Sequence, residues 1–146
     1  MHEIIFIKSE FSTHLSLPFA DGGVKAGFPA PAQDSVDRTL DLNKELIRHP
    51  AATFYCKVVG NSMIDAGICP DDLLVIDRSI EPYDGCTAVC FLNGEFTVKE
   101  LDLSRHAQGL IRLVPHNAEY APIEVHATDE FEIWGVVSFV IHKASR

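Results

Sequence analysis

The 146-residue sequence lacks any uninterrupted apolar run close to the roughly 20 residues that a membrane-spanning helix requires. Its first seven residues also lack the basic start and the long apolar stretch of a secretory signal. Internal repeats and low-complexity tracts are absent as well. The missing apolar run and the missing signal predict a cytoplasmic protein without a membrane partner.

Positive charge is scarce, because 12 lysines and arginines stand against 21 aspartates and glutamates, which gives a formal net charge of −9. The phosphate backbone of a nucleic acid repels such a chain on average, so direct DNA binding is not expected. The hydrophobic content of 47% suffices for one real core in a chain of this size, which argues against general disorder. The composition favours an acidic, soluble protein that acts on other proteins.

A Cys-x-x-Cys pair is also missing, and each of the four cysteines lies in or beside an apolar segment: Cys56, Cys69, Cys86 and Cys90. A metal site formed by Cys86, Cys90 and a histidine is one alternative. The favoured interpretation is a set of small buried thiols in a reducing compartment. No metal ion and no cofactor are therefore expected.

The beginning of the chain differs in composition from the rest. Residues 4–7 predict a short strand, but glycines and prolines are so dense over residues 18–31 that they predict an exposed, extended segment without regular structure. Proteases bind their substrates as extended peptides. Residues 24–29, with small side chains at their centre, are therefore a candidate cleavage segment.

The remainder predicts one short helix and then strands. Asp41 is a suitable N-cap, Leu42, Leu46 and Ile47 share one helical face, and Pro50 ends the helix. Asn93-Gly94 is a strong hairpin signal between two strands. The strands are expected at residues 53–60, 73–76, 87–92, 95–103, 110–114, 123–125 and 131–142. The chain is thus predicted to be mostly β, with a flexible N-terminal arm at residues 1–40 and a single domain at residues 41–146.

Two features of the β-rich part suggest chemistry, and the first is the sequence Gly60-Asn61-Ser62-Met63 directly after a predicted strand. A glycine before the serine permits a sharp turn that presents the hydroxyl group and directs nearby N–H groups at a carbonyl oxygen. Gly-x-Ser is common by chance, so this motif alone is weak.

The second feature is Lys99, which shares one strand face with Thr97 and Leu101. If Leu101 faces the core, Lys99 does so too. Burial disfavours the charged ammonium group, and a neutral amine is what a serine nucleophile needs from a neighbouring base. Strand lysines usually extend to water instead, so the spacing alone leaves an ordinary surface lysine as the more common outcome.

Together these motifs resemble the LexA/UmuD self-cleaving serine peptidase family (peptidase S24), and within it the UmuD-like subgroup that includes plasmid-borne members. Residues 60–63 and 71–75 resemble its nucleophile region, and residues 94–99 resemble its lysine strand. Residues 26–32 resemble the self-cleavage site, and shorter matches lie at residues 41–43, 49–53 and 134–137. The resemblance implies a compact β domain of the LexA/signal-peptidase type.

The resemblance also implies a role for each residue of the site. Ser62 attacks the carbonyl carbon of the Ala26–Gly27 bond, neutral Lys99 takes its proton, and water hydrolyses the acyl-enzyme on Ala26. The backbone N–H groups of Asn61 and Ser62 are the implied oxyanion donors. A Ser–Lys dyad is a known variant of the catalytic triad. None of the seven histidines has a local context that pairs it with Ser62.

LexA relatives carry a DNA-binding domain before the cleavage site, but here only 26 residues precede it, so a repressor is not expected. The UmuD resemblance implies that the arm is removed in the SOS response to DNA damage, with a RecA filament on single-stranded DNA as activator. The shortened homodimer then acts as the accessory subunit of an error-prone, UmuC-like Y-family polymerase in translesion synthesis.

Two alternatives belong to other functional classes. In one, the protein is a non-catalytic polymerase-binding module with a vestigial dyad. In the other, it is a general peptidase that acts on foreign chains. The matching cleavage site within the chain and the missing membrane anchor disfavour the general peptidase.

Overall fold

The computed structural model describes residues 4–8, 14–19 and 38–145, and within them the chain is mostly β, as predicted. None of the described helices is long and apolar enough to cross a membrane. The elements in chain order are β1 (Ile4–Lys8), β2 (Ser16–Phe19), β3 (Arg38–Asp41), α1 (Leu42–Leu46), η1 (Pro50–Ala52), β4 (Thr53–Val58), η2 (Ile64–Ala66), β5 (Leu73–Asp77), β6 (Thr87–Leu92), β7 (Glu95–Asp102), η3 (His106–Gln108), β8 (Ile111–Val114), β9 (Ile123–Val125) and β10 (Phe131–Ile141).

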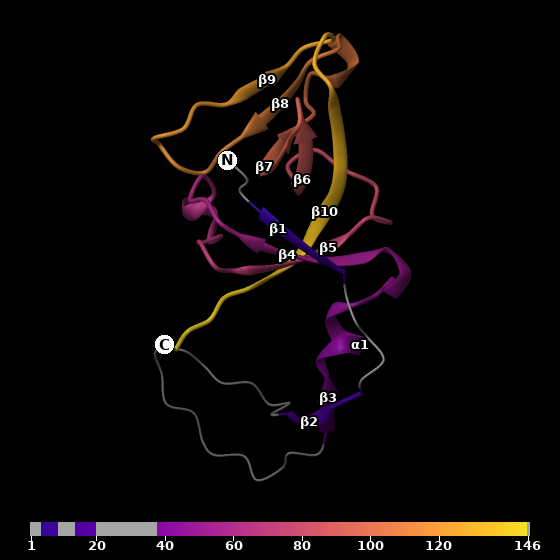
Figure 1. Cartoon of the computed structure of the whole chain (residues 1–146). Coiled ribbons are helices and arrows are strands. Elements are labelled where there is room, and N and C mark those ends of the chain that lie inside the picture. Colours follow the sequence, from indigo (N-terminus) through magenta and orange to yellow (C-terminus); the bar gives the residue numbers. More distant parts are fainter. Residues whose placement is uncertain (1–3, 9–13, 20–37, 146) are drawn as a thin grey trace. The chain divides into compact units, whose positions relative to one another are not determined.

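One antiparallel sheet of eight strands dominates the fold, in the order β1-β4-β5-β10-β6-β7-β8-β9 (Figure 1). The 11-residue strand β10 connects its two parts, because its first half pairs with β6 and its second half pairs with β5. β6 and β7 form the predicted hairpin, with Asn93 and Gly94 at positive φ in its turn.

The sheet carries two hydrophobic core clusters, and β6 and β7 contribute to both of them. Val89 and Val98 belong to the first cluster, whereas Ala88 and Leu101 belong to the second. Both faces of this hairpin are therefore buried. A polar side chain in the middle of β7 must consequently find its partners inside the protein.

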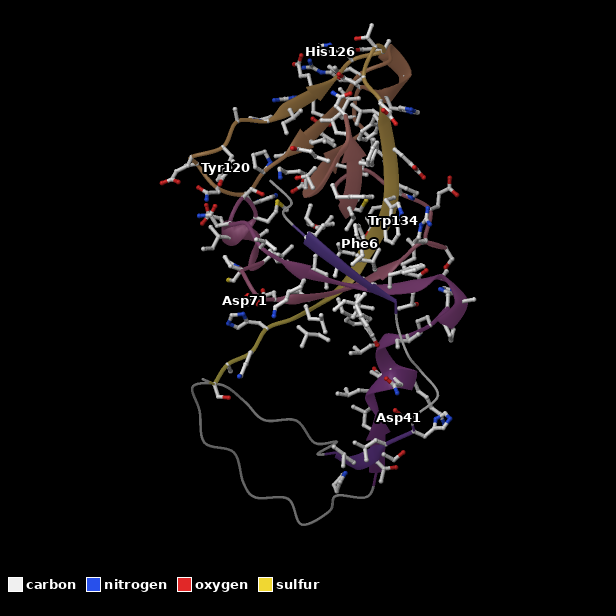
Figure 2. The ribbon with its side chains drawn as sticks, in the orientation of Figure 1. Phe6, Asp41, Asp71, Tyr120, His126 and Trp134 are labelled. Atoms are coloured by element: carbon white, nitrogen blue, oxygen red, sulfur yellow. The ribbon has the colours of Figure 1, made fainter. Side chains whose placement is uncertain are left out.

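β1 is fixed to the sheet by pairing and by aromatic packing. It runs antiparallel to β4, and the Phe6 ring lies 4.6 Å from the rings of both Phe96 and Trp134, measured between centroids (Figure 2). Edge-to-face and tilted ring pairs of this kind stabilise packing beyond their buried area. The strand predicted at residues 4–7 is therefore confirmed.

The described chain forms two compact units. One contains β1 together with residues 49–145, and the other contains β2, β3 and α1. This grouping follows contacts within the structure, whereas the predicted division between residues 40 and 41 separates a flexible arm, which carries the predicted cleavage site, from the peptidase domain. That division stays a prediction.

The second unit is more regular than its sequence predicts. Ser16–Phe19 and Arg38–Asp41 pair as an antiparallel ribbon, although regular structure was not expected in this region. Pro18 is tolerated there because a two-stranded ribbon consists only of edge strands. The predicted helix is confirmed, since the Asp41 carboxylate accepts the Asn43 N–H at 3.0 Å. Its predicted shared face is not uniformly covered, because Leu42 is 57% exposed.

Candidate active site

Ser62 lies in the segment between β4 and η2, and its side chain is almost fully buried, with 4% exposure. Met63 and Ile68 anchor this segment in the first core cluster. The Ile68 N–H donates to the Met63 carbonyl at 3.2 Å, and Gly67 permits this reversal with a φ of +80°. The position of the hydroxyl group is thus set by core packing on its C-terminal side.

A second segment, residues 115–120 between β8 and β9, forms hydrogen bonds with Asn61 and Ser62. These two residues are called the serine turn below. The His116 N–H donates to the Ser62 carbonyl at 2.8 Å. The Asn117 side-chain amide donates to the Asn61 carbonyl at 3.0 Å, and the Tyr120 hydroxyl donates to Asn61 Oδ1 at 2.8 Å. Sequence reasoning did not identify these residues. The Pro115-His116-Asn117 sequence signals a loop, but no local pattern shows where that loop packs.

Lys99 lies in the middle of β7, directly opposite Ala88 in the β6–β7 register. The expectation that Leu101 and Lys99 are both buried is confirmed, since Leu101 is 0% and Lys99 is 3% exposed. Ala88 is fully buried, and its small side chain leaves room on the hairpin face that it shares with Lys99. A long side chain can therefore lie within the protein rather than extending to water.

Three uncharged oxygen atoms lie within hydrogen-bonding distance of the Lys99 amine. Its Nζ lies 2.9 Å from Ser62 Oγ, 2.6 Å from Thr97 Oγ1 and 3.2 Å from the Val98 carbonyl oxygen. A neutral amine has two N–H donors and one lone pair. It can donate to Thr97 and Val98 while its lone pair accepts the Ser62 hydroxyl proton, so the arrangement suits a base directed at Ser62.

The backbone N–H groups of Asn61 and Ser62 donate no hydrogen bond within the described part of the chain. Two adjacent N–H groups without acceptors at a nucleophilic hydroxyl are suited to stabilise a developing oxyanion. One hollow beside them is lined by Val58, Gly60, Ser62, Met63, Ile68 and Val98. A second hollow, with Lys99 in its wall, is lined by Leu92, Glu95, Phe96, Thr97, Lys99, Tyr120, Ala121 and Ile123.

A histidine and two cysteines are other candidate reactive groups, but the histidine contacts another residue and the two thiols are protonated. The His116 ring contacts the Glu100 carboxylate through Nε2, so this nitrogen is directed at Glu100 and not at the Ser62 hydroxyl. Burial raises the pKa of the Cys56 thiol to about 12, and burial likewise raises the pKa of Cys90 to about 12. Both thiols are therefore protonated at neutral pH and make poor nucleophiles.

The structure thus brings Asn61, Ser62 and Lys99 together in one place. The predicted scissile residues Ala26 and Gly27 lie outside the described residues. Cys56, Cys86 and Cys90 are buried, as predicted, but Cys69 is only partly buried. Cys86 and Cys90 do not join a histidine in any metal-ligand cluster of the described residues.

Comparison with known proteins identifies one family and several relatives that cover most of the chain. Residues 18–138 match the family model described as Peptidase S24-like. Protein SamA of Salmonella typhimurium is 42% identical over 118 residues, which are 81% of this chain and 79% of that protein. Protein MucA of Escherichia coli is 38% identical over 135 residues, or 92% of this chain and 90% of MucA. Protein ImpA of Escherichia coli is 40% identical over 125 residues, or 86% and 82% of the two chains.

Proposed function

The chain belongs to the Peptidase S24-like family, and from this premise we propose that it is a serine endopeptidase that cleaves its own Ala26–Gly27 bond. The observation that carries the proposal is the 2.9 Å separation between Lys99 Nζ and Ser62 Oγ. Both side chains are nearly excluded from water, at 3% and 4% exposure. Burying a lysine beside a serine lowers the stability of the fold, and such an arrangement is typical of a functional site.

In the proposed reaction, the Ser62 oxygen attacks the carbonyl carbon of Ala26 and its proton passes to Lys99. The N–H groups of Asn61 and Ser62 stabilise the oxyanion. Lys99 then delivers the proton to the departing amine of Gly27, which leaves an ester between Ala26 and Ser62. Water hydrolyses this ester with Lys99 again as base, and this step restores the serine.

We place this cleavage in the SOS response to DNA damage, as the route that produces a shortened accessory subunit for a UmuC-like Y-family polymerase in translesion synthesis. The similarity to MucA, ImpA and SamA over most of the chain supports the assignment. A RecA filament on single-stranded DNA is the proposed activator, and it acts by favouring the conformer in which the cleavage segment occupies the site.

We further propose that the shortened protein is a cytoplasmic homodimer. Phe139 and Ile141, which are two residues apart and therefore lie on the same face near the end of β10, are 38% and 41% exposed. Contiguous exposed apolar side chains commonly mark protein–protein contacts. The end of β10 is therefore part of the surface through which we expect two copies to associate.

The decisive experiment follows the intact mass of the purified full-length protein at about pH 10, where a sizeable fraction of ordinary lysine amines is neutral. Wild type should release a fragment ending at Ala26, and Ser62→Ala should remain whole. Ser104→Ala, which changes an exposed serine, is the matched control and should be processed like wild type. If wild type stays intact even with a RecA filament, the protein is an interaction module with a vestigial dyad.

Removing one hydroxyl from the segment that holds Asn61 should slow cleavage without unfolding the protein. Tyr120→Phe deletes the 2.8 Å hydrogen bond to Asn61 Oδ1, and we expect a roughly 5–10-fold lower rate, the effect of losing about one net hydrogen bond. The cleavage rate and the melting temperature are measured together.

Tyr83→Phe is the control for this change, because Tyr83 is 59% exposed and none of the contacts that hold the serine turn involves it. It should cleave at the wild-type rate. Equal rates for all three proteins would show that the Tyr120 contact does not position the serine turn.

A further inference from the structure

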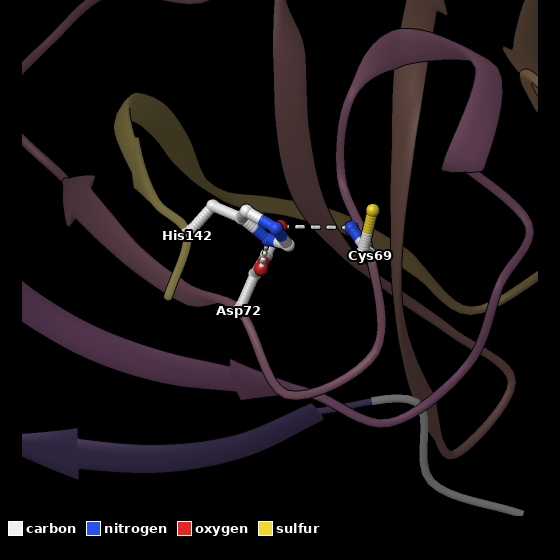
Figure 3. A group of neighbouring side chains, drawn as sticks. All are labelled: Cys69, Asp72 and His142. Atoms are coloured by element: carbon white, nitrogen blue, oxygen red, sulfur yellow. Dashed lines mark hydrogen bonds and ion pairs between the residues drawn. The ribbon is translucent and has the colours of Figure 1, made fainter. Parts of the chain in front are cut away.

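Three potential metal ligands of different chemistry converge at one place outside the Ser62–Lys99 site. The thiol of Cys69, the carboxylate of Asp72 and the imidazole of His142 each offer one ligand atom, and these atoms lie within 4.8 Å of one another (Figure 3). Cys69 and Asp72 come from the connection between η2 and β5, whereas His142 directly follows β10. Tertiary folding therefore joins residues that are far apart in the sequence.

The turn that carries Cys69 and Asp72 is rigid. The Asp72 N–H donates to the Cys69 carbonyl at 3.1 Å, and the Cys69 N–H donates back to Asp72 Oδ2 at 2.8 Å. Pro70 in the second position and a φ of +72° at Asp71 in the third are features of a type II turn. This reciprocal bonding fixes two of the three ligands relative to each other.

The carboxylate of Asp72 is buried but faces an accessible partner. The Asp72 side chain is 2% exposed, and its Oδ1 lies 2.5 Å from His142 Nδ1, whose side chain is 59% exposed. A buried carboxylate requires a hydrogen-bonding or ionic partner. Here that partner is a histidine that solvent and ions can reach.

We propose that Cys69, Asp72 and His142 form a binding site for a divalent transition-metal ion, with Zn²⁺ as the best match. Thiolate, imidazole and carboxylate are the ligands that Zn²⁺ takes in proteins, whereas Mg²⁺ and Ca²⁺ prefer oxygen atoms only. Three protein ligands leave a fourth position for water. The deeply buried Cys56 and Cys90, with pKa values of about 12, are unsuited to the same role.

The metal takes the place of the hydrogen bond between His142 and Asp72. Zinc bonds of about 2.0–2.3 Å in a tetrahedral site place neighbouring ligand atoms roughly 3.3–3.6 Å apart. The His142–Asp72 contact must lengthen from 2.5 Å, and any two ligand atoms that lie near the 4.8 Å limit must move closer together. His142 can make this adjustment because it lies just beyond the last residue of β10, Ile141.

Metal binding therefore ties the segment after β10 to the turn before β5. The metal site includes neither Ser62 nor Lys99, so the test of metal binding is independent of the proposed peptidase activity. This site is not predictable from the sequence, because Cys69-Pro70-Asp71-Asp72 is not a recognised metal motif and His142 is distant in the chain.

The test titrates Co²⁺ into the purified full-length protein under reducing conditions and records the absorption spectrum. We expect a thiolate-to-cobalt charge-transfer band that saturates at one ion per chain and disappears when Zn²⁺ is added. Cys69→Ser and His142→Ala should each weaken binding by at least the roughly 10–100-fold that loss of a supporting partner costs. His126→Ala, another exposed histidine, is the matched control and should bind like wild type.

A second measurement needs no variant. Zn²⁺ should protect Cys69 from alkylation by iodoacetamide in the wild-type protein, as located by peptide mass mapping. Absence of the charge-transfer band, absence of protection at Cys69, or unchanged affinity in Cys69→Ser and His142→Ala would each overturn the proposed site.

Discussion

Replacing Lys99 with alanine is expected to abolish cleavage of the Ala26–Gly27 bond while the protein keeps its fold. The change removes the amine that lies 2.9 Å from Ser62 Oγ, and loss of a general base typically lowers a rate by about 10²–10⁴-fold. The β7 backbone pairing with β6 and β8 does not depend on this side chain. Intact-mass kinetics measure cleavage, and circular dichroism checks the fold.

Lys99→Arg separates proton transfer from simple space filling. A guanidinium group keeps its charge at any pH that the protein tolerates, so this variant should stay uncleaved when the pH is raised. Wild type should accelerate towards about pH 10, because alkaline conditions favour a neutral lysine amine. Lys57→Ala, which removes an exposed lysine on β4, should behave like wild type. Normal processing by Lys99→Ala would remove the dyad from the mechanism.

Gly135→Ala is expected to destabilise the protein by roughly 1–3 kcal/mol, the usual penalty for overpacking a core. A Cβ atom at this position lies 2.6 Å from Ile76 Cγ2 and 3.2 Å from Arg78 Cγ. Ile76 is 0% exposed, so it cannot move aside without disturbing its neighbours. Gly135 also adjoins the irregularity in the β10–β6 register, and β10 is the strand that joins β5 to β6.

Urea unfolding of Gly135→Ala, wild type and a control on the same strand measures this effect. Glu132→Ala is the control, since its carboxylate is 62% exposed and lies 3.7 Å from the Arg78 guanidinium. Exposed ion pairs contribute little, so its free energy of unfolding should stay within about 0.5 kcal/mol of wild type. If Gly135→Ala unfolds at the same urea concentration as wild type, the β5–β10 contact is looser than the structure indicates.

Much of the secondary structure was predictable because its signals are local. Asp41 caps α1 with its own carboxylate, Asn93-Gly94 supplies the positive φ values of the hairpin turn, and the observed strands overlap those predicted. The ribbon of β2 and β3 was missed, since its pairing joins residues on either side of a segment rich in glycine and proline.

The candidate site was only partly predictable. Alternation along β7 placed Lys99 on the same face as the buried Leu101, and the resemblance to a family selected Ser62 as its partner. The contacts that hold the serine turn were not predictable, because Asn117 and Tyr120 follow Asn61 by 56 and 59 residues. No neighbouring residues encode where such a loop packs.

The sequence by itself therefore determined the β-rich class and the hairpin around Lys99, because alternation and turn preferences act between near neighbours, while the resemblance to a family selected Ser62 and Lys99 as candidate reactive side chains. Only the tertiary structure decided that Lys99 reaches Ser62, that residues 115–120 hold the serine turn, and that Cys69, Asp72 and His142 converge. Those contacts depend on strand register and on the packing of both sheet faces. Both arise from the whole chain rather than from any local segment.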